Sequence, residues 1–202
     1  MHRIGVVAVQ GDVSEHVDAA RLALEKYGIP GEAFPVRRRA DLDAADALTI
    51  PGGESTTISK LLQQAGLFDA ILQRAGSMPI LGTCAGAILL ASEGDEQVDK
   101  TDTRLLHLMD MAVDRNAFGR QRESFEADLA VKGLDSPVHG VFIRAPAITR
   151  VWGRCNALSS VRDKIVLARQ GHFLAAAFHP ELSGEYRIHK MLFDYLRTRG
   201  GP

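Results

Sequence analysis

The apolar residues of this chain switch repeatedly between two spacings, and this alternation restricts the possible folds more than any other feature of the sequence. Residues 4–9 form a short continuous apolar run, which is typical of a strand buried on both faces. Over residues 13–27 the apolar positions fall on one face of a helix, and Gly28 follows as a C-terminal stop. Asp12 stands in the N-cap position with Glu15 three residues later, which is the spacing of a capping box.

The same alternation continues through the first half of the chain. Further strands are expected at residues 33–36, 47–50 and 79–81, and helices at residues 55–65, 68–75 and 85–92. A polar segment at residues 93–104 follows them and indicates an exposed loop. Because strands and helices alternate, this half predicts right-handed crossovers and a parallel sheet.

The second half of the chain is rich in strand patterns. Strands are expected at residues 106–113, 125–131, 138–144, 165–169 and 173–178, and a closing helix at residues 185–197. Glycine and proline punctuate these segments, and the chain has no internal repeat, low-complexity tract or linker. The sequence therefore predicts one α/β domain over residues 1–202, with an additional β-rich half.

Charge and hydropathy argue against several classes of protein. The 24 Lys and Arg residues against 25 Asp and Glu residues give a net charge of −1, which lacks the positive field that nucleic-acid binding requires. The arginine triplet at residues 37–39 indicates a solvated loop. No apolar run approaches the ~18 residues that cross a membrane, and the start does not resemble a signal peptide. We therefore expect a soluble cytoplasmic protein with no nucleic-acid or membrane partner.

The cysteines and histidines show no metal-ligand spacing. Cys84 and Cys155 are too few for a disulfide framework, and no Cys/His cluster is present in the sequence. The sequence therefore predicts no metal and no cofactor. Six histidines are expected to be structural or exposed and to form no cluster: His2, His16, His107, His139, His172 and His189.

The segment Gly82-Thr83-Cys84-Ala85-Gly86 follows an apolar strand and precedes a helical run, which is the context of a nucleophile elbow. Such a sharp turn strains its central residue, and glycine two positions on either side removes the Cβ atoms that would clash. The helix N-terminus also favours the reactive thiolate. A buried cysteine in a glycine-rich turn is the alternative, but the complete pattern favours a nucleophile. Cys155 has no such context and is expected to pack in the core.

A thiol nucleophile needs a base, and the base needs a group that orients it. His179-Pro180-Glu181 supplies both at the end of an expected strand. Residues two apart on an extended chain point the same way, so Glu181 can accept a hydrogen bond from one ring nitrogen of His179 and leave the other for Cys84. Alone, this tripeptide is more often a surface turn. Together with the elbow it predicts a catalytic triad.

A glycine loop and two arginines complete the candidate site. The loop at residues 51–57, Pro-Gly-Gly-Glu-Ser-Thr-Thr, follows a strand, and its backbone N–H groups can reach a developing oxyanion. Ser55 or Thr56 is placed to cap the next helix. Arg115 and Arg144 lie at expected strand ends, where either could clamp a carboxylate. Taken alone, the loop is better explained by a plain glycine turn, and an exposed structural role explains each arginine equally well.

Taken together, these residues resemble a known family, the triad-type (class I) glutamine amidotransferases. The elbow and His179-Pro180-Glu181 mark only the class. Within it, the chain is most similar to the glutaminase subunits of pyridoxal 5′-phosphate synthase. The segments that carry this narrower resemblance are residues 9–12 with Glu15-His16, 51–57, 115–121 (Arg-Asn-Ala-Phe-Gly-Arg-Gln), 124–128 and 140–146 (Gly-Val-Phe-Ile-Arg-Ala-Pro). The resemblance covers nearly the whole chain and implies a three-layer sandwich around a mostly parallel central sheet.

The resemblance also implies an activity and roles for individual residues. L-glutamine would be hydrolysed to glutamate and ammonia, and the ammonia would pass to a barrel-shaped synthase subunit that makes pyridoxal 5′-phosphate from a pentose phosphate and a triose phosphate. Cys84 would be the nucleophile, His179 the base and Glu181 its orienting residue. Glutamine would be bound by Gly53, Glu54, Ser55, Arg115, Ile143 and Arg144.

The same resemblance gives Gln10 a place in the loop that meets the partner, and it assigns Gln10, Gly53 and Ala85 to the oxyanion hole. An idle glutaminase would waste glutamine. We therefore expect the oxyanion hole to form only when the partner docks.

Three other functions stay open at this point. A glutaminase that serves another synthase would differ only in its partner, and the segments at 115–121 and 140–146 weigh against it. A cysteine hydrolase or peptidase would not need Gly53-Glu54-Ser55 together with Arg144, and it would work unassisted. A non-catalytic regulatory or scaffolding subunit would be expected to have a broken triad, whereas this one is intact.

Overall fold

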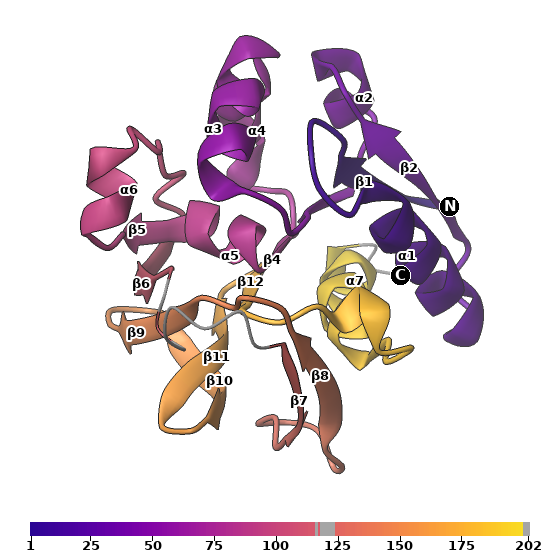
Figure 1. Cartoon of the computed structure of the whole chain (residues 1–202). Coiled ribbons are helices and arrows are strands. Elements are labelled where there is room, and N and C mark those ends of the chain that lie inside the picture. Colours follow the sequence, from indigo (N-terminus) through magenta and orange to yellow (C-terminus); the bar gives the residue numbers. More distant parts are fainter. Residues whose placement is uncertain (116, 118–123, 200–202) are drawn as a thin grey trace.

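Strands and helices alternate in the first half of the chain. The computed structural model describes residues 1–115, 117 and 124–199, and Figure 1 shows its elements. The strands of the first half are β1 (His2–Val7), β2 (Gly31–Val36), β3 (Ala47–Ile50), β4 (Ile80–Thr83) and β5 (Ala91–Glu93). Its helices are α1 (Val13–Lys26), α2 (Arg39–Asp43), α3 (Ser55–Gln64), α4 (Leu67–Ala75), α5 (Ala85–Leu90) and α6 (Glu96–Lys100).

The second half contributes most of the antiparallel structure. Its strands are β6 (Met109–Asp114), β7 (Phe125–Leu129), β8 (Val138–Phe142), β9 (Ala147–Val151), β10 (Asn156–Val161), β11 (Lys164–Gln170) and β12 (Phe173–Ala176). A short 3₁₀ helix, η1 (Pro180–Leu182), and the closing helix α7 (Arg187–Arg199) follow. β7 and β8 pair with each other as a separate antiparallel sheet.

The ten-stranded main sheet has the order β2-β1-β3-β4-β12-β11-β9-β6-β5, and β10 pairs with β11 beside this path. β1 to β4 pair in parallel, and β12 joins them as a parallel neighbour of β4. From β12 onward the pairing to β11, β9 and β6 is antiparallel. A strand near the end of the chain therefore lies beside the strand that leads into Cys84.

Helices cover both faces of the parallel half of this sheet, as Figure 1 shows. Successive strand residues point to opposite faces, so Ile80 belongs to the hydrophobic core beneath α3, α4 and α5. Leu81, the next residue, belongs to the second core, to which Leu24 of α1 and Phe193 of α7 also contribute. These three layers confirm the predicted α/β fold.

Several elements differ from the sequence prediction. β9 and β10 are not predicted, because their apolar residues are interrupted by polar ones and both strands are only partly buried. The arginine triplet expected in a loop runs into α2, which forms because Leu42 is buried and Arg39 pairs with Asp43 at 2.9 Å. The helix expected at residues 85–92 ends at Leu90, where the chain becomes extended and begins β5.

The polar segment at residues 93–104 is also not a plain exposed loop. It contains α6, which Asp95 caps by accepting hydrogen bonds from the N–H groups of Gln97 and Val98 at 3.0 Å each. Val98 is buried and anchors this helix to the core.

No helix in the described ranges is long and apolar enough to cross a bilayer.

Candidate active site

Cys84 occupies the sharp turn between β4 and α5. Its φ of 49° lies in the left-handed region, where a residue with a side chain is strained. A Cβ atom at Gly82 would lie 2.5 Å from the carbonyl oxygen of Gly86, and one at Gly86 would overlap the carbonyl oxygen of Ile50. Both positions accept only glycine, so the structure has the sharp, glycine-flanked turn that the sequence predicted around Cys84.

β12 brings His179 to the same edge of the sheet as Cys84. β12 and β4 are parallel, with Ala176 opposite Thr83, and the Cys84 N–H donates to the Ala176 carbonyl at 2.8 Å. The carboxyl ends of parallel strands meet at one edge, where the sites of α/β proteins form. The backbone N–H of His179 donates to the carbonyl of Val141 at 2.8 Å, which fixes the residue against β8.

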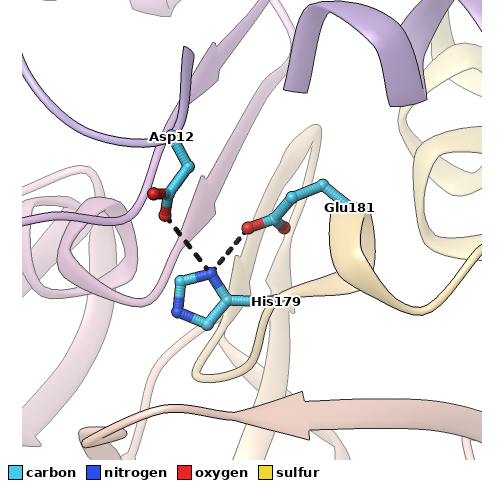
Figure 2. A group of neighbouring side chains, drawn as sticks. All are labelled: Asp12, His179 and Glu181. Carbon is cyan, nitrogen blue, oxygen red and sulfur yellow. Dashed lines mark hydrogen bonds and ion pairs between the residues drawn. The ribbon is translucent and has the colours of Figure 1, made fainter. Parts of the chain in front are cut away.

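Glu181 in η1 orients the His179 ring. Nδ1 of His179 donates to Oε1 of Glu181 at 2.6 Å, and both residues are buried (Figure 2). Burial alone would lower the pKa of His179, but hydrogen bonds with Cys84 and Glu181 raise it to about 10. Burial would raise the pKa of Glu181, but the contacts with His16 and His179 lower it to about 2. The carboxylate is therefore ionised at neutral pH and acts as a hydrogen-bond acceptor.

The glycine loop after β3 touches both Cys84 and His179. A Cβ atom at Gly52 would lie 2.6 Å from Cε1 of His179 and 3.4 Å from Cβ of Cys84. Gly53 has a φ of 141°, which residues with side chains rarely adopt, and the side chain of Gln10 covers it. Oε1 of Gln10 accepts the Glu54 N–H at 3.0 Å. The expected oxyanion loop thus lies against Cys84 and His179. One of its backbone N–H groups, that of Glu54, is already hydrogen-bonded to the side chain of Gln10.

Glu54 caps helix α3. Its carboxylate accepts hydrogen bonds from the N–H of Thr57 at 2.6 Å and from the N–H of Thr56 at 3.1 Å. Burial would raise the pKa of Glu54, but the hydrogen bonds with Thr57 and Thr56 hold it below its ordinary value. The prediction that Ser55 or Thr56 caps this helix is wrong, because the acidic side chain one residue earlier takes the same N–H groups.

Arg115 reaches the site from the end of β6, and α6 holds it in place. Its guanidinium donates to Oγ of Ser55 and Oγ1 of Thr56 at 3.1 Å each, and to Oγ1 of Thr101 at 3.1 Å. Asp95 accepts the Arg115 backbone N–H at 2.8 Å, and its Oδ1 lies 3.7 Å from Nε of Arg115. The polar segment between the two halves therefore builds one wall of the site.

An open cavity of about 580 Å³ joins these elements. The predicted site residues that line it are Gln10, Gly53, Glu54, Ser55, Cys84, Ala85, Arg115, Ile143, Arg144 and His179. Glu181 lies behind His179. The lining residues that the sequence did not assign to the site are Asp12, Thr56, Ile88, Gln97, Thr101 and Pro146. Arg144 has a φ of 45°, a strained backbone of the kind that clusters at functional sites.

Asp12 places a second carboxylate beside the His179 ring. Its Oδ2 lies 3.6 Å from Nδ1 of His179 (Figure 2), and its side chain makes no hydrogen bond to the N-terminus of α1, so the predicted capping box is wrong. Ligand atoms of Asp12, His179 and Glu181 lie within 4.8 Å of one another, a spacing that a metal ion could bridge. Nδ1 of His179 carries the hydrogen donated to Glu181, however, and a protonated nitrogen is not a metal ligand. The expected absence of a metal stays a prediction.

His16 also reaches this site, which corrects the expectation that the other histidines form no cluster. Its Nε2 lies 2.9 Å from Oγ1 of Thr83 and 3.3 Å from Oε2 of Glu181. Its ring centroid lies 6.5 Å from that of His189 on α7. Spacing along the chain gives no sign of these contacts, since the fold brings the residues together from distant segments.

Comparison with known proteins identifies the family. A profile of the SNO glutamine amidotransferase family matches residues 6–197. The chain belongs to this family. A relative from Archaeoglobus fulgidus, named pyridoxal 5′-phosphate synthase subunit PdxT, is 53% identical over 97% of this chain and 99% of its own length. A relative of the same name from Methanosarcina barkeri is 51% identical over 95% of this chain and 96% of its own length.

Solved structures agree with this assignment. One solved chain, from the crystal structure of a glutamine amidotransferase, is 45% identical to this chain in sequence. The alignment covers 95% of this chain and 97% of the solved one, with a TM-score of 0.84. A putative GMP synthase protein from Thermoplasma acidophilum, which is 16% identical, covers 98% of this chain and 96% of its own with a TM-score of 0.62, and it shares the fold alone. The chain is therefore a glutamine amidotransferase with the expected class I fold.

Proposed function

We propose that Cys84, His179 and Glu181 are the catalytic triad with which this chain hydrolyses L-glutamine to glutamate and ammonia. One observation carries the proposal. The 2.6 Å hydrogen bond from Nδ1 of His179 to Glu181 leaves the opposite ring nitrogen for Cys84, and both Cys84 and His179 face the same cavity. This is the arrangement that a thiol nucleophile needs from its base.

The roles of the triad follow from these positions. Because the pKa of His179 is raised to about 10, its ring holds the proton that it takes from the Cys84 thiol, and the sulfur attacks the carbon of the glutamine side-chain amide as a thiolate. The resulting oxyanion is stabilised by donors of the Gly53 loop and by the N–H of Ala85, because the first N–H groups of a helix have no partner within it. As the C–N bond breaks, His179 returns its proton to the leaving nitrogen and ammonia departs. Water then loses a proton to His179 and attacks the thioester, which releases glutamate and restores the thiol.

The cavity also offers groups for the rest of the glutamine molecule. Arg115 and Arg144 provide guanidinium groups that can bind the α-carboxylate. We assign the remaining glutamine contacts to Gly53, Glu54, Ser55 and Ile143, which line the same cavity.

The ammonia is delivered to a synthase partner that makes pyridoxal 5′-phosphate, in vitamin B6 biosynthesis. Relatives named as subunits of that synthase, at 51% and 53% identity over nearly the whole chain, support this function. The partner in this proposal is a barrel-shaped subunit that uses a pentose phosphate and a triose phosphate, and the two chains form a hetero-oligomer. Neither nucleic acid nor membrane takes part. The reaction belongs in the cytoplasm, where the free Cys84 thiol stays reduced.

Residues 1–202 form one glutaminase domain in this proposal. Both hydrophobic cores pack against the same main sheet, and residues of the two halves of the chain line the same cavity.

Gln10 connects the site to docking of the partner. Its side chain covers Gly53 and takes the Glu54 N–H at 3.0 Å, so this donor is not free to bind an oxyanion. The partner, by contacting the loop around Gln10, moves this side chain off the Glu54 N–H, and the loop then completes the oxyanion hole together with Gly53 and Ala85. Full glutaminase activity of the isolated chain would contradict this part of the proposal.

Glutamate release from glutamine tests the proposal, measured in the presence and absence of the matching synthase, with Cys84→Ala as the control. We expect release that depends on Cys84 and rises when the synthase is added. Release that depends on Cys84 but ignores the synthase would keep the glutaminase and overturn the partner. Release by a folded Cys84→Ala protein, or none from the unsubstituted chain in either condition, would overturn the triad.

A further inference from the structure

A histidine buried beneath the triad takes no part in the chemistry above. The side chain of His16, on α1, is fully enclosed. Its Nε2 lies 2.9 Å from Oγ1 of Thr83, the residue before Cys84, and 3.3 Å from Oε2 of Glu181. A single ring therefore contacts both the turn that carries the nucleophile and the carboxylate that orients the base.

We propose that His16 is a positioning residue for this reaction, whose Nε2–H anchors Oε2 of Glu181 so that Oε1 stays aligned with Nδ1 of His179. The inference rests on the proposed function, because it takes Glu181 to be the residue that orients the base. It extends the triad by one residue from a different segment of the chain.

The two oxygens of Glu181 have different surroundings. Oε1 accepts the hydrogen bond from His179 at 2.6 Å. Oε2 is buried and makes no hydrogen bond of standard geometry with the described residues; Nε2 of His16 makes a polar contact with it at 3.3 Å. The torsion that turns a carboxylate is soft, so without this contact the group would be free to rotate away from His179.

The position of the hydrogen on His16 follows from its neighbours. Glu181 is ionised at neutral pH and can only accept, so a hydrogen between the two groups belongs to Nε2 of His16. Oγ1 of Thr83 is closer than Glu181 and makes the hydrogen bond with Nε2, so the carboxylate interacts with the positive end of the same N–H at 3.3 Å. Nδ1 of His16 is buried and has no hydrogen-bond partner among the residues described, which suits a bare nitrogen better than an N–H.

The groups behind His16 do not compete for its ring. His189 of α7 faces it at 6.5 Å between centroids, and both ring nitrogens of His189 lack hydrogen-bond partners within the described ranges. Burial lowers the pKa of His189 to about 3, so this second ring is neutral at physiological pH. The single N–H of His16 is therefore directed to the triad.

Two substitutions at His16 separate positioning from packing. His16→Phe keeps a ring and removes the N–H, whereas His16→Gln keeps a donor near the place of Nε2. At saturating glutamine and with the synthase present, we expect His16→Phe to lower kcat about tenfold or more at nearly unchanged KM, because a base that loses its alignment slows the chemical step. His16→Gln should restore most of kcat. Unchanged kcat in folded His16→Phe would overturn the proposal.

A double-mutant cycle tests whether His16 acts through Glu181. In a Glu181→Gln background, His16→Phe should lower kcat no further, because the carboxylate that it anchors is already gone. Equal losses in both backgrounds would overturn the proposal and leave His16 a packing role. If the unsubstituted chain releases no glutamate with the synthase, the proposed function fails instead, so the two failures are distinguishable.

Histidine-selective isotope-labelled NMR spectra of the full, unsubstituted chain provide a test that does not depend on any variant folding. We expect the His16 resonances at neutral pH to show a hydrogen on Nε2 and a bare Nδ1. A hydrogen on Nδ1 with a bare Nε2 would leave no donor for Glu181 and would overturn the proposal.

Discussion

Gly52→Ala places one methyl group between the glycine loop and the catalytic imidazole. Its Cβ would lie 2.6 Å from Cε1 of His179, 3.1 Å from Oδ2 of Asp12 and 3.4 Å from Cβ of Cys84. The backbone at Gly52 does not have a positive φ, so the conformation itself accepts alanine. The whole effect of the substitution therefore comes from this contact.

The distances set the size of the effect. The ring and the methyl group must separate by about 0.8 Å to reach an ordinary 3.4 Å contact, and Glu181 restrains the ring at 2.6 Å. Misplacement of a catalytic group by about 1 Å costs about 100-fold, so we expect kcat/KM to fall about 100-fold, or about 2.7 kcal/mol of transition-state stabilisation. Overpacking at this buried loop should also lower the free energy of unfolding by about 1–3 kcal/mol.

Glutamate release in the presence of the synthase measures the first quantity, and denaturant unfolding of the chain measures the second. Gly76→Ala is the matched control, because a Cβ there meets no atom within 4 Å and its backbone is in the right-handed helical region. The control should keep its activity and gain up to about 1 kcal/mol in stability. If Gly52→Ala keeps activity within about threefold of the unsubstituted chain, the loop, nucleophile and base are not in the contact described.

Three further predictions concern stability and substrate binding. Gly86→Ala should lower the free energy of unfolding by about 3 kcal/mol, because its Cβ would overlap the carbonyl oxygen of Ile50; a loss under about 0.5 kcal/mol in denaturant titration would contradict this close approach. Asp95→Asn should raise KM for glutamine about three- to tenfold with kcat nearly unchanged, because asparagine still caps α6 but loses both the charge beside Arg115 and the oxygen that accepts the Arg115 backbone N–H; steady-state kinetics with an unchanged KM would refute it. Burial lowers the pKa of His189 from 6.5 to about 3. Between these two pH values, His189 therefore binds a proton in the unfolded chain but not in the folded chain. Stability should therefore fall by about 1.4 kcal/mol per pH unit from this residue, and a titration in which His189→Phe shows the same acid loss would contradict the assignment.

The parallel half of the fold can be predicted from the sequence because most of its strands contain a short apolar run. β3 and β4 are buried at every position, and short runs of this kind are typical of strands covered on both faces. β9 and β10 carry no such run, because they are only partly buried and mix apolar with polar residues; their pairing with other strands shows that they are strands. α6 depends on one buried side chain, Val98, and on its cap, which are too few for a periodic pattern.

The candidate site, too, can be predicted from the sequence only in part. The elbow around Cys84 and the pair His179 and Glu181 can be recognised because each motif lies within a few consecutive residues. The contacts of Asp12 and His16 are different, because α1 packs beside η1 only in the folded chain. A polar residue before a helix predicts a cap, and an isolated histidine predicts no cluster; the tertiary contacts of Asp12 and His16 override both expectations.

Reaction of the chain with a glutamine-like electrophile tests the central claim most directly, followed by identification of the modified residue by mass spectrometry. Cys155 is the internal control, because burial raises the pKa of its thiol to about 11 and keeps it in the unreactive protonated form. The account predicts modification at Cys84 alone, protection by added glutamine, and loss of rapid labelling in His179→Ala. Modification at Cys155, or labelling of Cys84 that glutamine does not slow, would contradict it.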